Sequence, residues 1–227
     1  MNKIAFLTTI FPMKEQFLID FFESLVLQTH KGFDVVVVND GYANFNEIKL
    51  KYSMLNIVEL KHCDTPAKNR EYGINYCIEC RYKKLIFGDS DDYFSENRVE
   101  ASIELLSGHE IVVNDVSLFN DTGIYEEKYM SHRLRDKTKV RLDFIKDKNI
   151  FGLSNTALRT SILNKVHFDK DLVAVDWYFY TNLLKQKYNA IFTNGAITYY
   201  RQHNDNTVGL KVINDNYYLW FESELED

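Results

Sequence analysis

The chain has 227 residues and a formal net charge of −6, because 33 aspartates and glutamates outnumber 27 lysines and arginines. This acid surplus argues against a nucleic-acid partner, since proteins that bind nucleic acids normally present a basic surface to the phosphates. The three cysteines are an odd number, and no apolar stretch approaches the roughly 18 residues of a membrane-spanning helix, so we expect a cytoplasmic protein.

The first half of the chain alternates between short apolar runs and stretches with helical periodicity. The apolar runs predict five strands, at residues 4–9, 35–38, 56–60, 84–88 and 111–114. Residues 17–26 have a helical apolar face, Thr65 and Pro66 suit the N-cap and first position of a second helix, and Ser95 is expected to cap a third. Such alternation predicts an α/β fold with a mostly parallel central sheet and helices on both faces.

The second half of the chain is less regular. Residues 115–150 are mostly polar and show no clear period apart from a turn at Thr122 and Gly123. Residues 154–165 and 176–187 look partly helical. Residues 190–193 and 196–201 look like a hairpin or edge strands.

Polar residues follow three of the predicted strands at the point where each strand ends. In an open parallel sheet, ligands bind at the carboxyl ends of the strands. The residues at these ends are Thr8, Thr9 and Phe11 after the first strand, Asn39, Asp40 and Gly41 after the second, and Asp89, Ser90, Asp91 and Asp92 after the fourth. We therefore expect them to converge on one rim of the sheet.

The acidic run Asp89–Asp92 carries the clearest chemical signal. Three carboxylates within four residues form a hard oxygen site that suits Mg²⁺ or Mn²⁺ bridging to phosphate oxygens, although a solvated acidic turn is the alternative. The nine glycines are dispersed, which excludes the clustered glycines of dinucleotide folds and P-loops. A bound diphosphate would therefore have to be neutralised in another way.

Six segments, taken in order, carry a family resemblance. They are Glu23–Thr29, Val35–Gly41, Arg70 with Gly73, Phe87–Tyr93, Asp176 with Trp177, and Tyr200–His203 with Asn206. Together they resemble family 2 glycosyltransferases with the GT-A fold. The resemblance covers most of the chain, and it implies one GT-A domain over residues 1–227. In this domain a nucleotide-sugar-binding half spans residues 1–114, an acceptor-side half spans residues 115–210, and a C-terminal tail spans residues 211–227.

The resemblance also implies a role for each matching residue. The implied nucleotide-sugar contacts are Thr8, Thr9, Phe11, Asp40, Arg70, Asp89 and Ser90, with Asp40 on the base. Asp91 and His203 are implied ligands of Mn²⁺ or Mg²⁺, Asp176 is the implied catalytic base, and Asp92 and Trp177 are placed on the acceptor side. Three departures from the family pattern stand out, namely Val175 before the base, Asn39 in the second-strand motif, and Lys68 and Asn69 where small residues are frequent.

These roles describe a metal-dependent, inverting transfer. One carboxylate deprotonates an acceptor hydroxyl as that hydroxyl attacks the sugar, and a metal ion stabilises the departing diphosphate. The implied donor is a nucleotide-diphosphate sugar, with a UDP-sugar favoured, and the implied acceptor is a glycan or a lipid-linked hydroxyl.

Other interpretations stay open at this point. A phosphatase of the haloacid dehalogenase type also places an Asp-x-Asp motif after an apolar strand, and a non-catalytic binder of sugar nucleotides or glycans could keep the same fold. Cys77 and Cys80, with His62 and Cys63 upstream, could be imagined as a zinc site, but they fall within a predicted helix, where buried cysteines are common.

The segment 128–148 differs from the rest of the chain in charge. It contains eight lysines and arginines and three aspartates, a balance of 8 − 3 = +5. We expect it to face an anionic acceptor, such as a lipid-linked diphosphate sugar, or an anionic membrane surface as a peripheral contact. A solvated face of mixed charge is the alternative.

Overall fold

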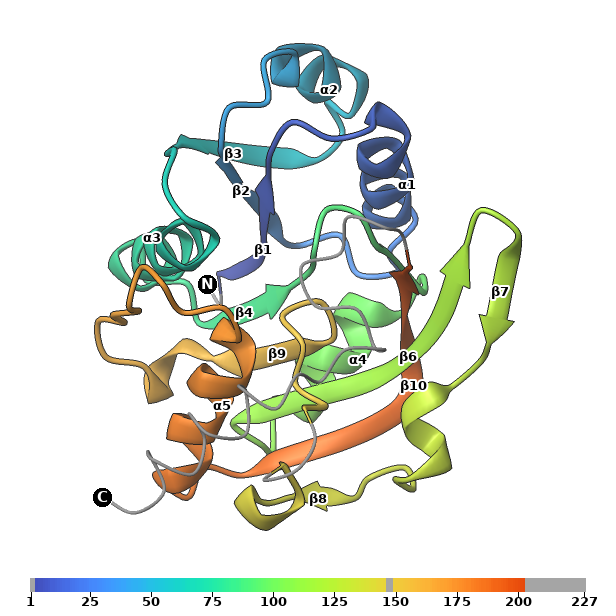
Figure 1. The fold of residues 1–227 in the computed structure, drawn as a ribbon, viewed down its shortest axis with the longest axis vertical. Helices are drawn as coiled ribbons and strands as arrows, with labels where there is room; N and C mark the ends of the chain where they lie inside the picture. Colours follow the sequence, from blue (N-terminus) through green and yellow to red (C-terminus); the bar gives the residue numbers. More distant parts are fainter. Residues whose placement is uncertain (1–2, 146–148, 203–227) are drawn as a thin grey trace.

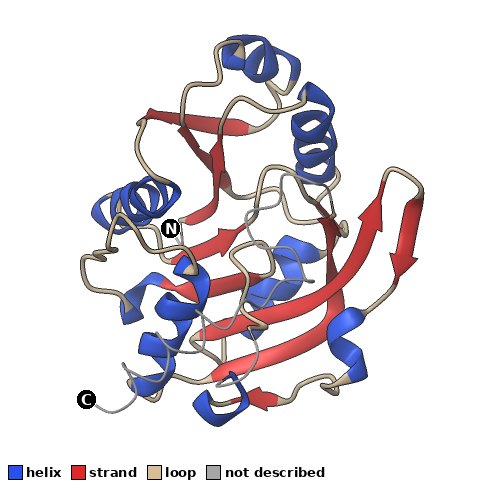
Figure 2. Cartoon of the chain, viewed as in Figure 1, coloured by secondary structure: helices blue, strands red, loops and turns tan. Residues whose placement is uncertain are grey.

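The computed structural model describes residues 3–145 and 149–202 as an α/β fold built around one sheet (Figure 1, Figure 2). The strands are β1 (Ile4–Ile10), β2 (Asp34–Asn39), β3 (Asn56–Lys61), β4 (Lys84–Phe87), β5 (Tyr93–Phe94), β6 (Ile111–Asn120), β7 (Gly123–Glu126), β8 (Lys139–Val140), β9 (Thr156–Arg159) and β10 (Ala190–Arg201). The α-helices are α1 (Glu15–Val26), α2 (Phe45–Lys51), α3 (Pro66–Glu79), α4 (Arg98–Leu105) and α5 (Val175–Lys185). Short 3₁₀ helices η1, η2 and η3 span Tyr129–His132, Leu142–Ile145 and Thr160–Ile162.

The sheet has ten strands in the order β3-β2-β1-β4-β9-β6-β10-β5, with β7 paired to β6 and β8 paired to β10. The first four strands in this order are parallel, as the alternation of strands and helices predicts. In the second half of the chain only β6 and β10 pair in parallel, and β5, β7, β8 and β9 pair antiparallel. The sheet is therefore parallel on the N-terminal side and mixed on the other.

Helices cover both faces of the sheet, as predicted. Successive side chains of a strand point to opposite faces, so each central strand contributes to two cores. Ala5 and Leu7 of β1 pack into one core together with residues of α3 and α5. Ile4 and Phe6 of the same strand pack into a second core with residues of α1, α2 and α4. The central strands are buried on both sides, which explains why they read as continuous apolar runs.

The start of α3 confirms the predicted cap, whereas the start of α4 does not. The Thr65 hydroxyl accepts a hydrogen bond from Lys68 N at 3.4 Å, and Pro66 occupies the first helical position. The N-cap of α4 is Asn97. The Ser95 hydroxyl instead accepts a hydrogen bond from Ile197 N at 3.0 Å, so this residue fastens the helix entry to β10.

The second half contains more strand than its sequence pattern predicts. Residues 115–120 continue β6, and a hairpin then returns along β7. Residues 154–165, predicted as partly helical, hold β9 and the single turn η3. Residues 190–201 form one long strand with a register shift between Thr193 and Ile197, in place of the expected hairpin or pair of edge strands. Within the two described ranges, no helix is long and apolar enough to cross a membrane.

Gly88, directly after β4, lies where a side chain cannot fit. A Cβ atom there would lie 2.5 Å from Cε1 of Phe6 and 2.6 Å from Cζ of Phe94, whereas a Cβ at Gly108 would meet nothing within 4 Å. We expect Gly88→Ala to lower the free energy of unfolding by about 1–3 kcal/mol through overpacking. Urea denaturation checks this result, with Gly108→Ala as the control that changes little. Equal stability of the two variants would contradict the packing described here.

Candidate active site

The carboxyl ends of β1, β2 and β4 meet at one rim, as expected for a parallel sheet. Gly88 N donates a hydrogen bond to Leu7 O at 3.1 Å, and Asp40 N donates to Ile10 O at 2.8 Å. The Ser90 hydroxyl donates to Thr9 O at 2.8 Å and fixes the acidic turn against the end of β1. The residues that follow these three strands therefore form a single polar surface.

Arg70 and two carboxylates from separate elements come together at this rim. The Arg70 guanidinium, from α3, lies 3.5 Å from Oδ1 of Asp89 in the turn after β4. Burial and the charges of Asp91 and Asp176, opposed by Arg70, together raise the pKa of Asp89 to about 6. Burial likewise raises the pKa of Asp176, and Arg70 again offsets part of the rise. Three segments far apart in the sequence thus build one electrostatic cluster.

Tyr200 in β10 belongs to the same cluster, although the sequence singles it out only as part of a late motif. Burial raises the pKa of its phenol, and the charges of Asp92, Asp89, Asp91 and Asp176 raise it further. A phenol beside several carboxylates stays protonated and can donate a hydrogen bond to an anion.

Asp92 was predicted on the acceptor side, but its carboxyl group is fully buried. One oxygen accepts a hydrogen bond from the Ser154 hydroxyl, and the other accepts from Arg201 N at 2.8 Å. Burial raises the pKa of Asp92 well above its usual range, and the neighbouring charges of Asp91 and Asp89 add to the rise. Asp92 therefore holds the turn from the inside.

Arg201 anchors the same turn through its side chain. Its Nε donates to Asp91 O at 2.7 Å, and a terminal nitrogen lies 2.5 Å from Oδ2 of Asp20 in α1. The guanidinium lies over the rings of Phe17 and Phe119, 4.4 Å from each centroid. The late motif predicted from sequence thus holds the acidic turn in place.

Asp176 lies in the first turn of α5, and Ala174 is the N-cap of that helix. Its Oδ1 accepts a hydrogen bond from Trp177 N at 2.8 Å. Trp177 was predicted on the acceptor side, but its ring is buried in the core and its Nε1 donates to Ile145 O at 2.9 Å. Trp177 therefore anchors the start of α5 to η2.

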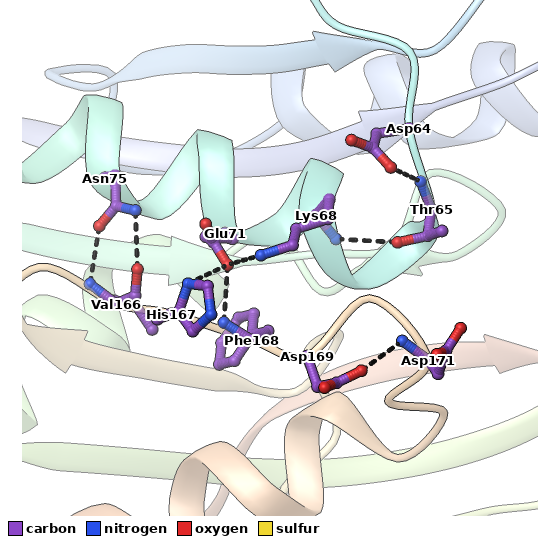
Figure 3. A network of polar contacts seen from close by, with 10 residues as sticks. All are labelled: Asp64, Thr65, Lys68, Glu71, Asn75, Val166, His167, Phe168, Asp169 and Asp171. Atoms are coloured by element: carbon purple, nitrogen blue, oxygen red, sulfur yellow. Dashed lines mark hydrogen bonds and ion pairs between the residues drawn. The ribbon is translucent and has the colours of Figure 1, made fainter.

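The loop before α5 is fastened to α3 by contacts that the sequence did not predict (Figure 3). Asn75 exchanges two hydrogen bonds with the backbone of Val166, at 2.8 and 2.9 Å. Glu71 accepts from Phe168 N at 2.6 Å and from Lys68 Nζ at 2.8 Å. Val166 and Phe168 lie more than 90 residues from their partners Asn75 and Glu71, so no local pattern could have indicated these contacts.

The ring of Phe168 connects this loop to α5. It is buried, with its centroid 5.7 Å from that of Phe179 and 6.4 Å from that of Tyr178. The position of α5, and with it that of Asp176, therefore depends on α3, the helix that also carries Arg70.

The other predicted site residues differ in how accessible they are. Thr8 and Ser90 are buried, and the Thr8 hydroxyl has no hydrogen-bond partner within the described part of the chain. Thr9 is half-buried and Phe11 is 49% exposed. His203 and the tail 211–227 lie outside the described residues.

Within residues 3–145 and 149–202, no group of three or more histidines, cysteines or acidic residues is arranged to hold a metal ion. Cys77 is buried in α3, and Cys63 is exposed before that helix. A divalent cation at the acidic turn would therefore share its coordination with ligand oxygens, which is how Mg²⁺ is commonly bound beside phosphates.

The decisive comparison is with a family model for glycosyl transferase family 2, which matches residues 9–168. The chain belongs to glycosyl transferase family 2. Its Arg70, Asp89 and Asp91 lie within the matched region, whereas Asp176 and Tyr200 lie beyond it.

Curated relatives of this family 2 chain include uncharacterized glycosyltransferases of Rickettsia felis and Rickettsia conorii. They are 28% and 27% identical to it over 119 residues, which is 50% of this chain and 19% of each relative. The chain therefore spans less than a fifth of the length of these proteins.

Solved structures with a similar fold include residues 1–349 of S. aureus TarS. The complex with UDP-GlcNAc superposes with a TM-score of 0.72 at 17% identity and covers 96% of this chain and 64% of that one. The complex with UDP gives a TM-score of 0.68 at 20% identity, with 89% and 61% covered. This likeness establishes the GT-A fold that the sequence predicted.

The raised pKa of Asp89 predicts a pH-dependent effect of neutralising it. Between the unfolded value of about 4 and the folded value of about 6, the folded state binds the proton more tightly, so stability falls as the pH rises through this range. In EDTA, Asp89→Asn should therefore raise the melting temperature at pH 7.5 and lose this advantage near pH 4. Asp121→Asn, which removes an exposed negative charge, is the control. An equal effect of Asp89→Asn at both pH values would contradict the prediction.

Proposed function

We propose that this family 2 chain is a metal-dependent, inverting glycosyltransferase that moves a sugar from a nucleotide-diphosphate donor to a hydroxyl of a glycan or lipid-linked acceptor. The observation that carries the proposal is the meeting of Arg70, Asp89 and Asp176 at the carboxyl rim of the sheet. These three residues come from separate elements and would have separate roles. Arg70 would bind an anion, Asp89 would lie beside the metal-bridged donor, and Asp176 would accept the proton.

The donor is proposed to bind along the rim, with its base at Asp40 and its diphosphate near Arg70 and Asp89. The S. aureus TarS structures bound to UDP and UDP-GlcNAc share this fold, which supports a UDP-sugar as donor. Thr9 is half-buried and Phe11 is exposed, and both lie at the edge of the sheet where the donor is proposed to bind.

Asp91, with His203, is proposed to hold Mn²⁺ or Mg²⁺. The chemistry of the turn fits a hard cation, because the charge of Asp91 raises the pKa of both Asp89 and Asp92 and a cation would relieve this repulsion. When bound, the ion would neutralise the charge that develops on the departing diphosphate.

Asp176 is proposed to act as the general base. Its half-buried carboxylate has a raised pKa, which makes it a stronger base than an exposed aspartate. The charge of Arg70 and the hydrogen bonds from Trp177 N and Asn149 favour its ionised form. The carboxylate would then accept the proton of the acceptor hydroxyl.

The basic segment 128–148 is proposed to contact an anionic acceptor or an anionic membrane surface. Residues 146–148 lie outside the described part of the chain, and the cations of residues 128–141 are all exposed, namely Lys128, Arg133, Arg135, Lys137, Lys139 and Arg141. Lys128 N donates a hydrogen bond to the Ser117 hydroxyl, and Ser117 in β6 pairs with Tyr199 of β10. Lys139 in β8 pairs with Ile191, which lies near the other end of β10. Eight residues of strand span about 26 Å, so the basic segment leads away from the rim over this distance.

A matched pair of substitutions tests the proposed catalytic roles. Asp91→Ala should abolish the Mn²⁺-dependent part of UDP binding, because the remaining carboxylates cannot hold the ion well. Asp176→Asn should keep UDP affinity within about twofold yet lower transfer by orders of magnitude.

Calorimetry with and without Mn²⁺ and a donor-turnover assay separate the two effects. Full turnover in Asp176→Asn would remove it as the base. Nucleotide binding without turnover of any donor in the wild type would favour a non-catalytic binder, and hydrolysis of simple phosphate esters would favour a phosphatase.

Charge reversal tests the basic segment. Arg135→Glu combined with Lys139→Glu should weaken binding to vesicles containing anionic lipid by about tenfold or more, since each cation near such a surface contributes about 1 kcal/mol. Lys83→Glu combined with Lys165→Glu is the control, because both of these lysines are exposed outside the segment. Co-sedimentation that does not depend on anionic lipid content would exclude the membrane contact and leave an anionic acceptor as the partner to test.

A further inference from the structure

Asn69 lies in the first turn of α3 with no exposed surface, at one of the positions where the family pattern favours a small residue. Its Nδ2 donates to Oδ2 of Asp40 at 2.8 Å and to Asp64 O at 2.9 Å. Its Oδ1 lies 2.7 Å from Nδ1 of His62. Every polar atom of this amide therefore has a partner, and one of these partners is the carboxylate at the end of β2.

The orientation of the amide follows from its partners. A flipped Asn69 would place its oxygen against the Asp40 carboxylate and the Asp64 carbonyl, which are both acceptors. Because Oδ1 consequently faces His62, the imidazole must carry a proton on Nδ1. The ring is held in this plane by stacking on Tyr72, with centroids 4.3 Å apart and an interplanar angle of 8°.

These contacts fix the Asp40 carboxylate from one side. Oδ2 is engaged by Asn69, and the backbone N of Asp40 is bound to Ile10 O. The carboxylate is half-buried and faces the Cys63 thiol, whose pKa it raises in addition to the effect of burial. Asn69 thus holds Oδ2 and fixes the rotation of the carboxylate, and a ligand would meet Oδ1 beside the exposed Cys63 thiol.

We infer that His62 and Asn69 are positioning residues for Asp40 and that they restrict it to a base edge with a single N–H donor. The inference rests on the proposed function, in which Asp40 binds the donor's base. Uracil and thymine present one N–H between two carbonyl groups, whereas guanine presents two adjacent donors that pair best with both oxygens of a carboxylate. Because Asn69 fixes the carboxylate and already donates to Oδ2, one N–H on Oδ1 matches the first kind of edge, whereas the second guanine donor would have to share Oδ2 with Asn69.

A purely structural amide is present on the same helix and serves as the comparison. Asn75 is also buried, but it bonds only to the backbone of Val166. Removal of either amide leaves unsatisfied buried groups and should lower the melting temperature. Only the removal of Asn69 should change how nucleotides are discriminated.

The experiment measures UDP and GDP affinities by calorimetry at constant Mn²⁺ for the wild-type chain, Asn69→Ala and Asn75→Ala. The wild type should prefer UDP. Asn69→Ala should weaken UDP binding about tenfold and GDP binding no more than twofold, so that the preference falls at least fivefold. Asn75→Ala should melt at a lower temperature yet keep the wild-type preference.

A second pair of variants tests the same chain of contacts from its other end. His62→Phe keeps the stack on Tyr72 but loses the donor to Asn69, so the preference should fall; His62→Gln restores a donor and should recover it. An unchanged UDP-to-GDP preference in both Asn69→Ala and His62→Phe, with UDP still bound, would overturn the positioning role alone. Failure of the wild type to bind any nucleoside diphosphate would overturn the proposed function and this inference with it.

Discussion

The carboxyl group of Asp92 has no exposed surface, and the shape of the acidic turn depends on how this group is satisfied. A buried carboxyl group is tolerated only when its oxygens are hydrogen-bonded, and here Ser154 and the backbone of Arg201 supply the donors. The side chain of Arg201 then binds the Asp91 carbonyl from beneath. Because the backbone is fixed from inside, Asp89 and Asp91 remain half-buried at the rim, where a ligand can meet them.

Helix α3 connects this rim to the other functional segments. Gly73 allows the helix to lie close to the sheet, since a Cβ atom there would come within 2.8 Å of Leu7 and 2.9 Å of Val38. Residues four apart on a helix share a face, so Glu71 and Asn75 both reach the loop before α5, while Arg70 reaches Asp89. Helix α3 therefore sets the distance between the residues proposed to bind the donor and the proposed base.

The parts of the fold that could be predicted are those set by local patterns. The apolar runs of β1 and β2 and the Thr65 cap depend on neighbouring residues, and the structure confirms them. The contacts that could not be predicted are those of residues whose partners lie far away in the chain. Ser95 bonds to residue 197, Asp92 to residues 154 and 201, and Trp177 to residue 145. Their residue types fit several roles, and only the tertiary contacts select one.

The net charge of −6 is unevenly distributed, and this distribution makes the proposed action on a nucleotide diphosphate compatible with an acidic chain. Carboxylates gather at the rim, where burial raises the pKa of Asp89, Asp92 and Asp176, and repulsion from neighbouring carboxylates adds to the rise at Asp89 and Asp92. This repulsion opposes folding of the empty site. A divalent cation with its diphosphate would relieve it, so binding and stability are coupled at the same residues. The exposed cations of residues 128–141 lead away from the rim along β10, which leaves them available for the larger anionic partner proposed above.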